Sequence, residues 1–126
     1  MSPYPKTSLA LSGLFFAIAI CSVEAQVTAQ VTAEVEIHAL IQAVEESGCE
    51  FERNGRRYDA LEAADHMRLK YRRAKRYADS AEKFIDRLAS KSSISGKPYL
   101  IVCATSGEHE AKEWLEAELV AQRKRS

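Results

Sequence analysis

The residues best suited to chemistry lie in the segment Ser92–Tyr99, which reads Ser-Ser-Ile-Ser-Gly-Lys-Pro-Tyr. Lys97 and the hydroxyl groups of serines such as Ser93 all donate hydrogen bonds, so together they could cradle a phosphate or another small oxyanion. The alternative is a tight turn, in which the serines bond the local backbone and Pro98 directs Tyr99 into a sheet. A nucleotide site is excluded, because the upstream glycine of a P-loop is missing and a proline stands where a Ser or Thr would hold magnesium.

His66 is the side chain with the most obvious capacity for proton transfer. It follows Asp65 and shares a helix face with Lys70, so it could act as a general acid or base, or simply form hydrogen bonds on a helix surface. His38, His66 and His109 lack the spacing of a helical metal pair, and we expect neither a metal nor a cofactor. The motifs G-x-S-x-G, H-E-x-x-H and C-x-x-C are absent, which excludes the commonest exported hydrolases and thiol oxidoreductases.

The first 25 residues have the pattern of a cleaved secretory signal peptide. Lys6 precedes an apolar run, Leu9–Ile20, that is too short to span a bilayer, and Val23-Glu24-Ala25 offers a cleavage site. The alternative is an anchor that stays attached. Cleavage after Ala25 predicts a periplasmic protein with no membrane span.

Two cysteines, Cys49 and Cys103, remain after cleavage at that position. An even pair in an exported chain predicts a disulfide, which would contribute roughly 4 kcal/mol by closing a long loop. The chain has 18 basic and 18 acidic residues, so no overall field attracts nucleic acid or a membrane surface.

A local basic patch lies between residues 68 and 76, where six bases occur with no acid among them: Arg68, Lys70, Arg72, Arg73, Lys75 and Arg76. Long cationic side chains commonly cover the edge of an apolar stripe while their charged ends stay in water. The alternative is a surface for an anionic partner, such as lipid head groups, an envelope polymer or an acidic protein. We expect no nucleic-acid partner, because few aromatic residues accompany these basic side chains and because the periplasm contains no nucleic acid.

The longest regular pattern runs from Leu61 to Leu88, with apolar residues at spacings of three and four: Leu61, Ala64, Met67, Tyr71, Ala74, Ala78, Ala81, Ile85 and Leu88. One unbroken helix from Asp59 to Ser90 would be about 48 Å long, against a radius of gyration of about 13 Å for a compact domain of this size. We therefore predict a break at Ser80, which can cap a second helix. The two helices cover 61–78 and 81–89.

The pair Asn54-Gly55 predicts a β-hairpin in which Phe51 lies opposite Tyr58. Before it we expect a flexible, extended lead-in over 26–32 and a helix over 33–46. After the two helices we expect a strand over 99–103, covered on both faces, and a last helix begun by a capping box of Thr105 and Glu108.

These elements define a single mainly helical α+β domain over residues 33–126. Its predicted order is helix, β-hairpin, two helices, strand, helix. A disulfide between residues 49 and 103 would place the strand beside the hairpin, which gives a small three-stranded antiparallel sheet.

Several short motifs occur together along the chain: Phe51, Arg53-Asn54-Gly55, Ala64 with His66 and Lys70, Ala81-Glu82 with Phe84-Ile85, and Ser92-Ser93 with Ser95-Gly96-Lys97-Pro98-Tyr99. On these motifs, from about Ile37 to Val102, the chain resembles the YfeK-like family of small exported proteobacterial proteins, a domain of unknown function. The resemblance implies a periplasmic location in a Gram-negative cell and no particular activity. The positions that match the family pattern are our candidate ligand-binding residues: His66, Lys70, Glu82, Ser93, Lys97 and Tyr99.

We therefore expect a non-enzymatic binding or envelope-interaction module, whose partner is an envelope protein or an anionic ligand. A second hypothesis is a domain that holds a small anion with the Lys97 loop facing His66. A third is a hydrolase-type enzyme with His66 as base and a loop serine or Tyr99. One concave pocket enclosed by the loop and His66 would favour the second or third, and a convex surface the first.

Overall fold

The computed structural model describes residues 3–5, 7, 13 and 20–126. The apolar run expected in the signal peptide therefore lies largely outside the described residues. From residue 20 onward the elements are α1 (Ile20–Glu46), β1 (Glu50–Arg53), β2 (Arg56–Tyr58), α2 (Ala60–Ala74), η1 (Lys75–Tyr77), α3 (Ala81–Phe84), η2 (Ile85–Ala89), β3 (Leu100–Cys103), β4 (Gly107–Glu110) and α4 (Ala111–Arg125).

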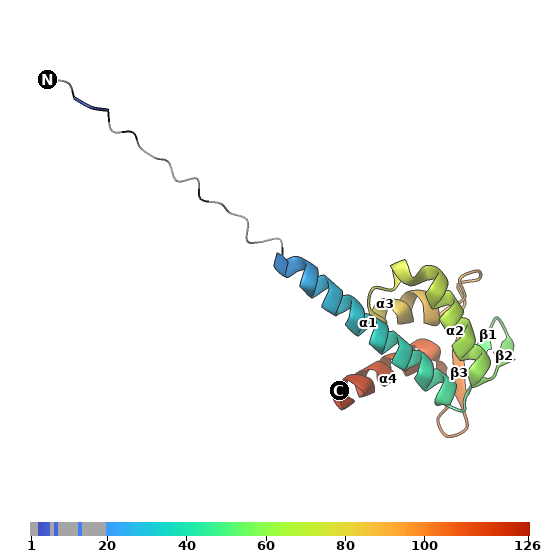
Figure 1. Cartoon of the computed structure of the whole chain (residues 1–126). Helices are drawn as coiled ribbons and strands as arrows, with labels where there is room; N and C mark the ends of the chain where they lie inside the picture. Colours follow the sequence, from blue (N-terminus) through green and yellow to red (C-terminus); the bar gives the residue numbers. More distant parts are fainter. Residues whose placement is uncertain (1–2, 6, 8–12, 14–19) are drawn as a thin grey trace.

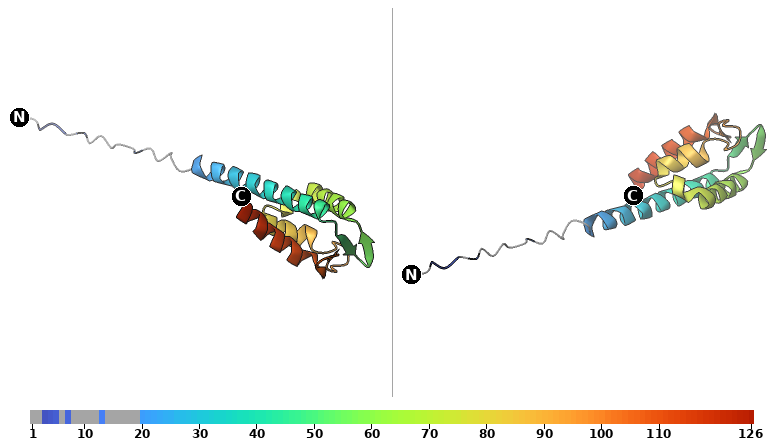
Figure 2. Two further views of the ribbon diagram at one scale, coloured as in Figure 1. Left: turned by 90° about the horizontal axis from the view of Figure 1, so that it is seen from below. Right: turned by 90° about the horizontal axis from the view of Figure 1, so that it is seen from above.

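The architecture is the expected mainly helical α+β class, with one antiparallel sheet at an end of a helical layer. In Figures 1 and 2, α1 runs along the domain, with α2 packed on one side and α4 on the other, and its N-terminal part projects beyond both. The sheet lies at the opposite end from the N-terminus. No helix within the described ranges is both long and apolar enough to cross a membrane.

Helix α1 begins earlier than the predicted start at residue 33. The part predicted to be helical, 33–46, packs into the core, where Ile37, Leu40 and Val44 are fully buried. The segment 26–32, expected to be extended, is helical and mostly exposed. Thr32, the residue before the predicted helix start, lies inside the helix and donates a hydrogen bond to the carbonyl of Thr28 one turn back at 3.0 Å, a geometry that helices accommodate.

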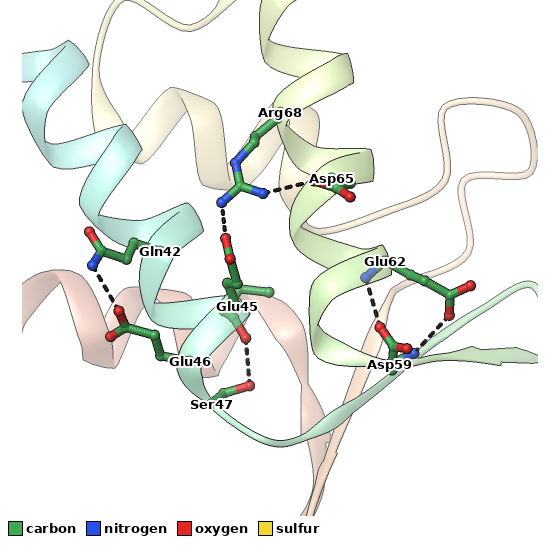
Figure 3. A network of polar contacts seen from close by, with 9 residues as sticks. Gln42, Glu45, Glu46, Ser47, Asp59, Glu62, Asp65 and Arg68 are labelled. Atoms are coloured by element: carbon green, nitrogen blue, oxygen red, sulfur yellow. Dashed lines mark hydrogen bonds and ion pairs between the residues drawn. The ribbon is translucent and has the colours of Figure 1, made fainter.

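The predicted break at Ser80 is confirmed. Helix α2 ends at Ala74, η1 adds one 3₁₀ turn, and the Ser80 hydroxyl then accepts a hydrogen bond from the Lys83 amide at 3.2 Å. Chain reversal at this point folds α3 and η2 back onto the core, where Phe84 and Ile85 are buried. The start of α2 is fixed by a capping box between Asp59 and Glu62, visible in Figure 3.

The hairpin has the predicted register, with Phe51 opposite Tyr58. Both turn residues have the positive φ expected of an Asn-Gly turn, 52° for Asn54 and 77° for Gly55. Strand β3 pairs with β1 as expected, and its buried face carries Ile101. The opposite face of β3 is only half covered, so the prediction that both faces are buried is wrong for Leu100 and Val102.

The sheet has four strands in the order β2-β1-β3-β4, so the prediction of three was one short. Residues 107–110 form strand β4 instead of the first turn of a helix, and the capping box of Thr105 and Glu108 does not exist. The reason is tertiary: β3 would otherwise leave its second row of amide and carbonyl groups unpaired. Helix α4 begins at Ala111, and its buried face includes Leu115 and Leu119.

The predicted disulfide between Cys49 and Cys103 is present, with Cα atoms 4.5 Å apart. It joins the end of α1 to β3, beside the ladder pair of Glu50 and Val102. A buried disulfide of this kind points to an oxidising compartment.

Candidate functional site

A cavity of about 300 Å³ lies between the β1-β2 hairpin and the first half of α2. Its walls include the side chains of Phe51, Ala63 and Met67, all of which are buried. Polar groups reach the cavity from three elements: Arg53 from the hairpin, His66 from α2, and Tyr99 from the residue before β3. The site is therefore assembled from segments far apart in the sequence.

Arg53 is the central polar residue of the cavity. One guanidinium nitrogen, Nη1, lies 2.6 Å from His66 Nε2, and the other, Nη2, donates to the Tyr58 hydroxyl at 3.0 Å. The guanidinium carbon also stands 4.9 Å from the centre of the Tyr58 ring, within the range of a cation–π contact. The hairpin positions both partners, because Arg53 is the last residue of β1 and Tyr58 the last of β2.

The contact with Arg53 defines the protonation state of His66. The same Nη1 also lies 3.1 Å from His66 Nδ1, and because a guanidinium has only donors, at least one ring nitrogen must accept and carry no proton. Burial, followed by the positive charges of Arg53 and Lys70, lowers the pKa of His66 below its ordinary value. His66 is thus a neutral imidazole at neutral pH.

Lys70 lies one turn further along α2, on the other side of Tyr99. Its ammonium donates to the Tyr99 hydroxyl at 3.3 Å and to the carbonyl of Lys91 at 3.2 Å. Burial and the nearby charge of Arg53 lower the pKa of Lys70 to about 8. Burial raises the pKa of Tyr99, with the charge of Arg53 opposing this shift, so the phenol keeps its proton at neutral pH.

The carboxylates around the cavity are engaged elsewhere. Asp65 pairs with Arg68 at 2.8 Å, Glu62 belongs to the capping box, and Glu52 lies 3.7 Å from Arg57. Figure 3 shows the first two of these contacts. Within the described part of the chain, no ion pair joins Arg53 or Lys70 to a carboxylate. Arg53, the arginine that lines the cavity, therefore has no carboxylate partner among the described residues.

Two of the six candidate ligand-binding residues, His66 and Tyr99, line the cavity, and a third, Lys70, does not line it but contacts Tyr99. Glu82 lies on α3 and forms an ion pair with Arg123 of α4 at 2.6 Å, so it connects two helices and does not line the cavity. Ser93 and Lys97 are exposed on the loop and do not line the cavity either. The predicted pocket enclosed by the Lys97 loop and His66 is therefore wrong in its loop half.

The loop after η2 is a tight turn organised by Ser92, which is buried. Its hydroxyl accepts hydrogen bonds from the amides of Ile94 and Ser95, both at 3.3 Å, and from Asn54 Nδ2 at 3.2 Å. Pro98 precedes Tyr99, whose amide donates to the carbonyl of Ser90 at 2.9 Å. This geometry matches the tight-turn alternative for the segment.

The basic patch divides into two groups. Arg68 pairs with Glu45 (Figure 3), and Lys75 pairs with Glu34 at 2.6 Å, so both connect α2 to α1. Apart from Lys70, described above, the remaining three bases, Arg72, Arg73 and Arg76, are exposed, and no ion pair involves them within residues 20–126. Their place at the C-terminal end of α2 favours cations, since the carbonyl dipoles there are negative.

Sequence reasoning did not select Arg53 and Tyr58 as site residues. The hairpin register, which was predicted correctly, already placed both on the strands beside the start of α2, and Arg53 belongs to a motif that carries the family resemblance. The sequence did not predict that the hairpin packs against α2, and this packing is what brings Arg53 and Tyr58 to His66. No group of three His, Cys, Asp or Glu side chains suited to a metal ion occurs in the part of the chain that the structure describes.

The fold and the cavity define a small disulfide-linked α+β domain with a cationic cavity between a hairpin and a helix. The chain belongs to the family of unknown function DUF5329, whose match covers residues 31–123. It is also similar to the uncharacterized protein YfeK of Salmonella typhimurium (strain LT2), with 44% identity over 64 residues, which is 50% of this chain and 53% of that protein. The chain thus spans about half the length of this curated relative. No solved structure matches the chain.

Proposed function

We propose that this domain is a non-enzymatic binding module that holds a small anionic ligand in the cavity beside Arg53. The supporting observation is that Arg53 and Lys70 are half-buried cations without a carboxylate partner in the described chain. Two partly desolvated like charges repel each other, and an anion bound beside Arg53 in the cavity would reduce that cost. The ligand supplies the missing counter-charge.

The same arrangement makes an enzyme with His66 as general base the weaker hypothesis. A base needs a free lone pair toward its substrate, and Arg53 Nη1 lies close to both ring nitrogens of His66, 2.6 Å from Nε2 and 3.1 Å from Nδ1. Ser93 stands outside the cavity, so no loop serine is available as a nucleophile there. The polar groups of the cavity suit binding and orientation better than proton transfer.

We further propose that the module is exported and works in the periplasm. The apolar N-terminal run and the small residues before Gln26 fit a signal peptide. The Cys49–Cys103 disulfide supports an oxidising compartment. The family resemblance points to the same location.

A second candidate function is contact with an anionic envelope surface through Arg72, Arg73 and Arg76. The observation in its favour is that these three arginines are exposed next to one another at the end of α2 and the following turn. Binding of this kind would weaken steeply with added salt.

The proposal is tested by NMR titration of the ¹⁵N-labelled protein with sodium phosphate, compared with sodium chloride at equal ionic strength. Phosphate should shift the signals of Arg53, Tyr58, His66 and Tyr99, and Arg53→Met should abolish these shifts. The matched control is Arg56→Met, because Arg56 lies directly opposite Arg53 in the hairpin, 5.4 Å from the Tyr58 ring centre, but does not line the cavity. Equal loss of binding in both variants, or shifts confined to residues 72–76, would contradict the proposal.

A further inference from the structure

We infer that the ligand of this cavity is amphipathic: a single oxyanion attached to a compact apolar body about the size of an aromatic ring. This inference rests on the anion-binding function proposed above and specifies the class of ligand. Three features of the cavity carry it: the donors at its inner end, the apolar side wall and the acids at its mouth.

The inner end presents donors. Tyr58 accepts a hydrogen bond from Arg53, and Tyr99 accepts one from Lys70. A phenol that accepts from a cation directs its own proton elsewhere, so both hydroxyl groups have a proton to donate. Together with the guanidinium they match an oxyanion, whose oxygens only accept.

The side wall is apolar. Phe51 is 4% exposed, Met67 3% and Ala63 7%, and all three line the cavity together with the Tyr58 ring. An inorganic anion alone would leave water against this wall. An apolar group attached to the anion would cover it, and the volume of about 300 Å³ is at the small end of ligand pockets, which limits that group to a compact one.

The mouth carries the exposed carboxylates of Glu62 and Asp65. Both side chains are exposed, so they lie where the cavity opens to solvent. A second negative charge on the outer end of a ligand would meet these acids and be repelled, which selects against polyanions. The favoured orientation therefore places one anionic group inward and the apolar body along Met67.

The test compares ligands in two pairs on the full mature protein, with inorganic phosphate against phenyl phosphate and acetate against benzoate. Phenyl phosphate should bind about tenfold or more tightly than phosphate, and benzoate should exceed acetate by a similar factor, because the ring covers apolar surface. A preference in only one pair identifies the oxyanion, phosphate or carboxylate, that the donors accept. Equal affinity within both pairs would overturn this inference and leave the anion-binding function standing. No binding by any of the four would overturn the function itself.

A cavity-filling variant provides the second test. Ala63→Met extends a side chain along the apolar wall and should remove the preference for phenyl phosphate while phosphate still binds. The control is Ala117→Met, on the exposed face of α4 and outside the cavity, which should keep the preference. An unchanged preference in Ala63→Met, with the variant folded by circular dichroism, would contradict the placement of the ring. If the Ala63→Met variant does not fold, the comparison of the two ligand pairs on the unaltered protein still tests the inference.

Discussion

Asn54 and Ser92 are 38 residues apart in the chain, and a hydrogen bond of 3.2 Å joins their side chains. The same carboxamide accepts from the Ser95 hydroxyl at 2.5 Å. These two bonds attach the tip of the hairpin to the loop before β3. Because Arg53 immediately precedes Asn54 and Tyr99 follows the loop, the attachment fixes the distance between the two sides of the cavity. The loop acts as a support of the site, and its lysine faces solvent.

Replacing Asn54 tests this role of the loop. Asn54→Gly keeps the turn, since glycine readily adopts the φ of 52° found here, but it removes both side-chain bonds. We expect a loss of about 1–2 kcal/mol in the free energy of unfolding, measured with urea, and weaker binding of phenyl phosphate. Asn54→Asp serves as the control, because it keeps an acceptor for Ser95. Wild-type affinity in the glycine variant would show that the attachment does not position the site.

The disulfide should carry a large share of the stability. Cys49 and Cys103 are 54 residues apart. A cross-link that closes a loop of that length raises the free energy of the unfolded state by about 4 kcal/mol, because it removes chain entropy there. The double variant Cys49→Ser, Cys103→Ser should unfold at much lower urea concentration, as should the wild type with a reductant. A thiol count of zero in the folded mature protein is the companion result. If the urea midpoint of the wild type stayed the same after a reductant was added, the prediction would be contradicted.

The cap at Ser80 should be worth about 1 kcal/mol. Ser80→Ala removes the acceptor for the Lys83 amide at the start of α3. Ser93→Ala is the matched control, because Ser93 is exposed on the loop. Thermal unfolding should show a lower midpoint for the first variant only, and equal midpoints would mean that another group caps α3.

Three candidate residues, Glu82, Ser93 and Lys97, neither line the cavity nor contact His66 or Tyr99, and they should be dispensable for binding of phenyl phosphate. Glu82→Gln, Ser93→Ala and Lys97→Ala leave the cavity walls unchanged, so the affinity for phenyl phosphate should stay within about twofold of wild type. Glu82→Gln should still lower stability slightly, since it removes an exposed ion pair with Arg123. A large loss of affinity in Lys97→Ala would contradict this prediction and would show that the Lys97 loop takes part in binding.

Lys70 should lose its proton near pH 8. In the unfolded chain it titrates near 10.5, so between these values the unfolded state binds more protons and stability rises with pH. Below pH 8 the buried charge is unfavourable, and Lys70→Met should be most advantageous for stability there. The side-chain ¹³C shift of Lys70, followed by NMR, gives the midpoint directly. Phenyl phosphate should raise this midpoint, and a midpoint of 10.5 in the free protein would contradict the structure of the site.

The features predicted correctly from the sequence are those decided by neighbouring residues. Asn54-Gly55 determines a two-residue turn and hence the hairpin register, and Ser80 can cap only the segment that follows it. Strand β4 was missed because Gly107–Glu110 is fully exposed and charged, and its structure depends on the free edge of β3. No local pattern contains that information.

The site shows the same division. His66, Lys70 and Tyr99 were selected by matching a family pattern, and the contacts of Tyr99 with His66 and Lys70 of α2 bring them together. Glu82 matched equally well but pairs with Arg123, because a family match marks a position without its neighbours. Arg53 was missed because its importance arises only when the hairpin packs on α2.

The most direct test of the anion-binding cavity is a crystal structure of the mature protein with phenyl phosphate. We predict phosphate oxygens at hydrogen-bond distance, about 2.7–3.2 Å, from Arg53 and from the hydroxyl of Tyr58 or Tyr99, with the ring against Met67. Density for the ligand only at Arg72, Arg73 or Arg76, with the cavity holding water alone, would contradict the account.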